Sequence, residues 1–140
     1  MKAELVPGVT FTRQIRVDRP RTIDFMGDEG RVYSTPSLVN DIEMTCYEGL
    51  LEYLDAGESS VGTHVELDHL AATLLDMNVT IDVRVAEVKG RLVTFEVTAR
   101  DTLDEIGRGK HVRFVVDVVK TVERLKAKAA RASATAGSAS

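Results

Sequence analysis

The first residue whose type and position could do chemistry is Glu43. It follows Val39 by four residues and precedes Cys46 by three, so on a helix it would lie within an apolar stripe. A carboxylate in such a stripe destabilises the fold unless it is paired, hydrogen-bonded or next to a wet cavity. Two readings stay open. Glu43 either reaches solvent at the edge of the stripe, or it is held there as a general base or nucleophile.

A histidine and a threonine are the next candidates. His69 ends a predicted strand, where it is either an ordinary surface residue or a neutral imidazole that binds a substrate carbonyl or moves a proton. Thr35 precedes Pro36, and this pair predicts a helix start with Thr35 as the N-cap. The cap hydroxyl could also face a site, because a helix N-terminus favours an oxyanion or a phosphate.

The segment EIGRGKHVRF resembles a phosphate-binding loop only weakly, because it does not lie between a strand and a helix. Its Gly107 and Gly109 fit better a strand edge or hairpin that another backbone approaches closely. The neighbouring Arg108, Lys110 and Arg113 could hold an anionic ligand, although basic residues on strands are usually solvated.

One long helix and five strands must position these residues. The helix is predicted from Thr35 to a stop at 55–57, since apolar residues recur at intervals of three or four. Alternating apolar residues predict strands at 9–18 (with a slip near Arg13), 59–68, 79–85, 93–99 and 112–118. Short connections favour antiparallel neighbours with one covered face. The predicted class is α+β: one helix across a curved antiparallel sheet, the arrangement called the hot-dog fold.

Composition limits the function classes. A length of 140 residues predicts one domain, which we assign to 1–124, followed at 125–140 by a frayed helix end and a disordered tail rich in Ser, Ala and Gly. A net charge of -4 and the absence of Trp argue against nucleic acid as a partner. The sequence has no apolar run long enough for a membrane span. One cysteine and three histidines argue against a metal site and favour the reducing cytoplasm.

Three segments, taken in order, resemble the hot-dog acyl-CoA thioesterases of the fluoroacetyl-CoA thioesterase type. They are STPSLVNDIEMTC, SSVGTHVELDHLAAT and DEIGRGKHVRFVV, within a resemblance that spans about residues 7–120. The resemblance implies a catalytic group of Thr35, Glu43 and His69, with Gly62 and Arg113 at the substrate. It also implies no cofactor and a homodimer or a dimer of dimers.

The expected reaction is therefore hydrolysis of an acyl-CoA thioester to the free acid and CoA. The family's lid, rich in Phe and Pro, corresponds here to FMGDEGRVYS, whose only aromatic residues are Phe25 and Tyr33. The acyl group stays open for this reason. Two alternatives also remain: a hot-dog enoyl-CoA hydratase, whose catalytic Asp and His motif we do not find, and a non-catalytic acyl-CoA binding or sensing domain.

Overall fold

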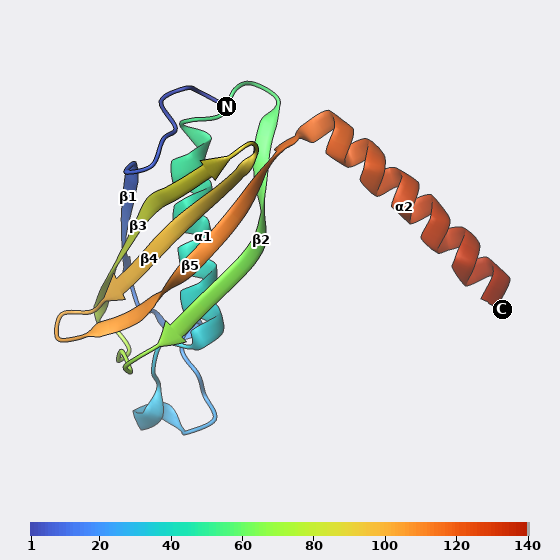
Figure 1. Ribbon diagram of the computed structural model, residues 1–140. Helices are drawn as coiled ribbons and strands as arrows, with labels where there is room; N and C mark the ends of the chain where they lie inside the picture. Colours follow the sequence, from blue (N-terminus) through green and yellow to red (C-terminus); the bar gives the residue numbers. More distant parts are fainter. Residues whose placement is uncertain (140) are drawn as a thin grey trace.

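The computed structural model describes residues 1–139, with side chains described through residue 135. The elements follow one another as β1 (Thr10–Arg16), α1 (Thr35–Leu51), β2 (Glu58–His69), β3 (Asn78–Lys89), β4 (Leu92–Arg100), β5 (Glu105–Asp117) and α2 (Val118–Ala139) (Figure 1). Two short 3-10 turns lie between β1 and α1, at Arg19–Arg21 and Asp28–Gly30.

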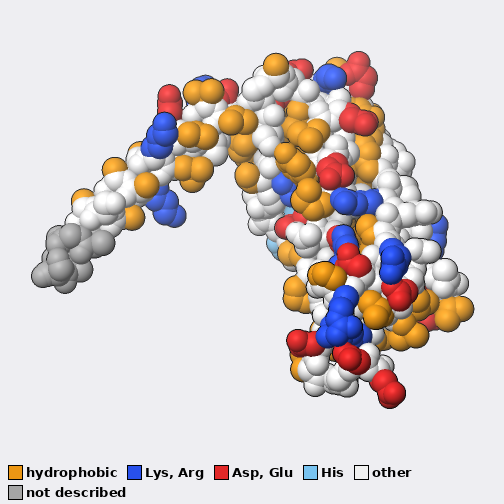
Figure 2. Space-filling model, turned by 180° about the vertical axis from the view of Figure 1, so that it is seen from behind, with side chains coloured by type: hydrophobic (Ala, Val, Ile, Leu, Met, Phe, Trp, Pro, Cys, Tyr) orange, Lys and Arg blue, Asp and Glu red, His pale blue; other side chains and the backbone are white. Residues whose placement is uncertain are grey.

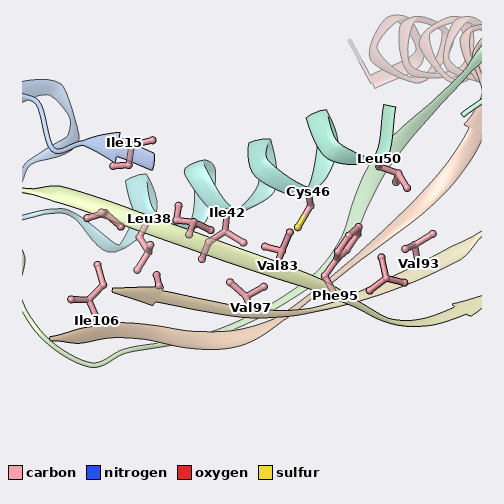
Figure 3. Close-up of a cluster of buried hydrophobic side chains, with 14 of the residues drawn as sticks. Ile15, Leu38, Ile42, Cys46, Leu50, Val83, Val93, Phe95, Val97 and Ile106 are labelled. Carbon is pink, nitrogen blue, oxygen red and sulfur yellow. The ribbon is translucent and has the colours of Figure 1, made fainter. Parts of the chain in front are cut away.

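The five strands form one antiparallel sheet in the order β1-β3-β4-β5-β2, and α1 lies across one of its faces (Figure 1). This confirms the predicted α+β, hot-dog layout. The core is the apolar stripe of α1 packed on inward side chains of the sheet (Figure 3). Its members include Leu38, Ile42, Cys46, Leu50, Val83, Phe95, Val97 and Ile106.

The slip predicted in β1 is wrong. The register with β3 is unbroken, and Arg13, opposite Ile81, takes an inward position between Phe11 and Ile15. Its long stem lies along the sheet while its guanidinium reaches Glu48 on α1 at 3.4 Å. A polar residue type therefore interrupted the sequence pattern without interrupting the strand.

Both ends of α1 differ from the prediction. The N-cap is Ser34, whose Oγ accepts from the backbone N–H of Ser37 at 3.1 Å, and Thr35 is the first helical residue. The helix ends at Leu51 rather than near Gly57. Gly57 has a φ of 82° and turns the chain into β2 instead, a conformation that glycine adopts without steric cost.

The close backbone approach predicted for Gly109 is found, but at neither a strand edge nor a hairpin, because β5 pairs with β4 on one side and β2 on the other. This residue lies inside β5, which starts at Glu105, earlier than the predicted 112. A Cβ placed on Gly109 would lie 1.9 Å from the carbonyl oxygen of Glu66 in β2. Only glycine allows this approach of the two backbones, so Gly109 sets the pairing of the strand that carries His69.

The C-terminal helix α2 leaves the body at the end of β5 and projects away from it (Figure 1). Hydrophobic side chains are exposed along the part next to the body (Figure 2), namely Val118, Val119, Val122 and Leu125. The domain boundary at 124 and the disordered tail stay predictions, and Ser140 lies outside the described residues. Within residues 1–139, no helix combines the length and apolar character that crossing a membrane requires.

Candidate active site

The first polar group of the candidate site lies where the start of α1 meets the end of β2. Thr35 Oγ1 and His69 Nδ1 are 2.7 Å apart, a hydrogen bond between the two elements. Because Ser34 caps the helix, the hydroxyl of Thr35 is available for this contact. The His69 ring also makes an edge-to-face contact with Tyr33, at 6.4 Å between centroids.

The Nε2 atom of His69 is buried and has no hydrogen-bond partner among the described residues. Buried polar atoms in folded proteins are nearly always paired, so this one marks a position for a ligand or another group. Burial lowers the pKa of His69, which favours the neutral ring. If Thr35 donates to Nδ1, then Nε2 carries a proton to donate; if Thr35 accepts, Nε2 is a base.

A cavity of about 440 Å³ opens beside this pair. Its walls come from the loop before α1 and from the segment after β2. Apart from Ser34, Thr35, Tyr33 and His69, the lining is apolar: Ile23, Phe25, Val32, Leu70, Ala71 and Ala72. An apolar cavity with a few convergent polar groups is the usual form of a small-molecule site.

A buried network holds the cavity wall in place. The hydroxyl of Tyr33 donates to the buried carboxylate of Asp41 on α1. Arg21 donates two further hydrogen bonds to the same carboxylate, at 2.9 and 3.1 Å. The paired charge of Asp41 thus ties the loop before α1 to the helix and fixes the ring that contacts His69.

The second polar group surrounds Gly62 in the middle of β2. A Cβ placed on Gly62 would lie 3.2 Å from Oε1 of Glu43 and 3.4 Å from Nη1 of Arg113. The carboxylate of Glu43 is therefore directed at the sheet, from a half-buried position. A carboxylate directed at the sheet does not reach solvent at the edge of the stripe. The placement of Glu43 therefore favours the other reading, a general base or nucleophile. The nearest atom to such a Cβ would be Cε1 of His111, at 3.1 Å, so only glycine lets these three side chains come this close to β2, and the space beside them opens at the exposed backbone of Gly62.

Arg113 is buried, with a 7% exposed fraction, and is the basic residue of its segment that turns inward. Its Nε and Nη2 donate to Oγ and the carbonyl oxygen of Ser60, at 2.8 and 2.9 Å, and it lies over the ring of Tyr47. Arg108 instead pairs with Glu105 on the exposed face, where Lys110 also lies. The three basic residues thus form no common anion site.

The candidate residues therefore form two groups rather than one within a chain. Thr35 and His69 are in contact, and Glu43, Gly62 and Arg113 surround one space. His69 and Gly62 are seven positions apart on β2, about 23 Å along an extended strand. No cluster of His, Cys, Asp or Glu within residues 1–139 could hold a metal ion.

Sequence reasoning missed the residues that support each group. Ser60 and His111 both contact Arg113, and Asp41 and Arg21 fix Tyr33. One signal was available for His111: it alternates with Arg113 and Val115 on the inward face of β5, so it interrupts an apolar row as Glu43 does on the helix.

A family model for fluoroacetyl-CoA-specific thioesterases matches residues 17–119. The fluoroacetyl-CoA thioesterase of Streptantibioticus cattleyicolor is 31% identical over an alignment of 135 positions, which covers 91% of this chain and 97% of that protein.

Among solved structures, a point mutant of the fluoroacetyl-CoA-specific thioesterase FlK has a TM-score of 0.83 at 30% identity, covering 91% of this chain and 99% of that one. A thioesterase superfamily member from Thermus thermophilus has a TM-score of 0.86 at 26% identity, covering 94% and 98%. With the fold, the polar pair and the cavity in place, these likenesses show that the chain belongs to the fluoroacetyl-CoA-specific thioesterase family.

Proposed function

We propose that the chain is an acyl-CoA thioesterase that hydrolyses its substrate to a free acid and CoA. Family membership supports the reaction class. A related FlK structure, 32% identical over 82% of this chain, is in complex with fluoroacetate and CoA. The observation that carries the proposal here is the buried Nε2 of His69, which lacks a partner and lies beside the cavity.

Thr35 and His69 are proposed to act on the thioester carbonyl. Attack on that carbon places negative charge on the oxygen, and donors aimed at it lower the barrier. A neutral His69 with a proton on Nε2 would donate to this oxygen, with its ring oriented through Nδ1 by the Thr35 hydroxyl. The partial positive charge at the start of α1 adds to the effect.

Glu43 is proposed to activate the attacking water or to attack the carbonyl itself. Because Gly62 has no side chain and its backbone is exposed, the thioester is proposed to approach this carboxylate along the backbone of β2. Arg113 lies beside the same glycine and is proposed to contact the substrate. Single turnover in heavy-oxygen water tests the second role, because label enters the Glu43 carboxylate only if an anhydride with the acyl group forms, CoA leaves, and water then attacks the Glu43 carbonyl carbon.

We further propose that two copies pair through β2. This strand ends the sheet opposite β1, so one of its edges has no strand partner within residues 1–139, and Val61 and Val65 are exposed on it. Antiparallel pairing about a two-fold axis at Glu66 would place Leu67 opposite Val65 and Asp68 opposite His64 of the second copy. The extra residue at the irregularity between Gly62 and His64 would then bring His69 next to Gly62. Each complete site would then combine Thr35 and His69 of one copy with Glu43, Gly62 and Arg113 of the other.

A panel of acyl-CoA substrates with a free-thiol readout tests the function and identifies the acyl group. Thiol release that is lost in His69→Ala supports a thioesterase. Loss of enoyl absorbance without thiol release would identify a hydratase, and saturable binding without turnover a sensor. Fluoroacetyl-CoA belongs in the panel, since Phe25, 80% exposed, lines the cavity where the family carries its lid. A cytoplasmic location and a dimer of dimers stay predictions.

A further inference from the structure

His111 is a completely buried histidine with no role in the function proposed above. It lies on the inward face of β5, between Val65 of β2 and Phe95 of β4. Burial is the main cause that lowers the pKa of His111. The ionisable groups that act on the ring are Glu43 from α1, Arg113 from its own strand and His64 from β2. The ring is therefore neutral at neutral pH, so one ring nitrogen is a donor and the other an acceptor.

Two contacts fix which nitrogen carries the proton. Nδ1 is 2.8 Å from the carbonyl oxygen of His64. A carbonyl only accepts, so Nδ1 must donate, and Nε2 then has a free lone pair. This lone pair accepts from Nη1 of Arg113 at 3.1 Å. The carbonyl belongs to the residue at the register shift between Gly62 and His64. The irregularity of β2 thus sets the tautomer of His111. This tautomer in turn leaves Nε2 free to accept the hydrogen bond from Arg113.

Neutral acceptors hold all three guanidinium nitrogens of Arg113. Ser60 accepts from Nε and Nη2, and His111 accepts from Nη1. None of the ion pairs among the described residues includes Arg113, so no carboxylate binds its charge directly. Nη1, the nitrogen bound to His111, is also the guanidinium nitrogen nearest Gly62, 3.4 Å from the position of a Cβ there, with Cε1 of His111 at 3.1 Å. A buried cation held in this way keeps its charge available to a substrate beside Gly62.

We propose that His111 is a positioning residue, a neutral hydrogen-bond acceptor that aims Nη1 of Arg113 at the space beside Gly62 and Glu43. This proposal rests on the function proposed above, in which that space receives the thioester. Without this acceptor, the guanidinium would keep its two hydrogen bonds to Ser60 but lose the one at Nη1. A displacement of about 1 Å at a positioned group costs about a hundredfold in rate.

The test compares two substitutions of similar size at His111. His111→Gln keeps a carbonyl oxygen near the place of Nε2, whereas His111→Leu has no acceptor. Lys110→Gln is the control, because Lys110 precedes His111 in β5 but is exposed on the other face of the sheet. We expect His111→Leu to lose about tenfold to a hundredfold in kcat. His111→Gln should recover most of this loss, and Lys110→Gln should match the parent.

Nitrogen-15 NMR gives a readout that does not depend on turnover. In the parent we expect His111 protonated on Nδ1 only, and separate, slowly exchanging Nη resonances for Arg113. His111→Leu should average the Arg113 resonances while its melting temperature stays near that of the parent. The proposal is overturned by an Nε2-protonated tautomer, or by an Arg113 signal as well ordered in His111→Leu as in the parent. If the parent shows these signals but hydrolyses no acyl-CoA, the proposed function fails instead.

Discussion

The hydroxyl of Thr35 serves one contact, the 2.7 Å hydrogen bond to His69. Thr35→Ser keeps this oxygen and should retain activity within a few-fold. Thr35→Val keeps the shape without the hydroxyl and should lose about a hundredfold in kcat, as for one lost group at an oxyanion site. Because Thr35 is exposed, both variants should stay within about 0.5 kcal/mol of the parent in unfolding free energy. Equal activity of the Val variant and the parent would remove Thr35 from the mechanism.

The buried His111 and the half-buried His69 should make stability depend on pH. Burial lowers the pKa of both His69 and His111 below the ordinary 6.5. Below this value the unfolded chain binds more protons than the folded chain, so unfolding becomes easier as the pH falls. We expect the urea midpoint to drop between about pH 7 and pH 5.5.

A carboxylate does not explain this drop. The pKa of Glu58, which the amino group of Met1 lowers to about 2, places its contribution at more acidic pH. His69→Gln should flatten the dependence, and His64→Gln, on the exposed side of β2, should not. An unchanged slope in the His69 variant would contradict the assignment of the drop to this ring.

At the scale of elements, α1 depends on Ser34 for its start. Ser34→Ala should cost about 1 kcal/mol, the usual value of an N-cap, because the Ser37 amide loses its acceptor. Thr35→Ala should cost clearly less in the same urea titration. The reverse order of costs would mean that Thr35 is the cap, as the sequence alone predicts.

The helix and strands were predictable where apolar residues recur at one regular interval, three or four positions in α1 and two positions in the strands. They were not predictable where neighbouring residues offer the same chemistry. Ser34 and Thr35 both suit a cap, and only the contact with His69 on another element separates them. Arg13 breaks an apolar pattern although its stem packs inward. The network of Tyr33 and Asp41 joins a loop to a helix, so no spacing reveals it.

At the scale of the whole molecule, the end of α2 should be dispensable. Side chains from 126 to 135 are exposed, and none is a large apolar residue. Deleting residues 129–140 should therefore leave the melting temperature and activity unchanged within error. The exposed residues Val122 and Leu125 remain in this variant. A drop of several degrees would show that the deleted segment docks on the protein.

The separation of the two polar groups along β2 leads to the sharpest test of the assembly. His69→Ala lacks the first group and Glu43→Gln the second, so each variant alone should be inactive. If the sites are shared across β2, a mixed dimer of the two variants has one site with both defects and one intact site. Random mixing makes half of the dimers mixed, so about a quarter of the parent activity should return.

The activity should return at the rate at which the subunits exchange, and light scattering should report a dimer before and after mixing. If each chain completed its own site, no activity should return, because every site in the mixture would lack either His69 or Glu43. The double variant mixed in equal amount with the parent is the control. On the shared model its mixed dimers have no intact site, so exchange should lower the activity from a half to a quarter of that of the parent at the same total concentration, whereas chains that complete their own sites should stay at a half. Absence of recovery despite proven exchange would place the thioester within one copy and overturn the shared site.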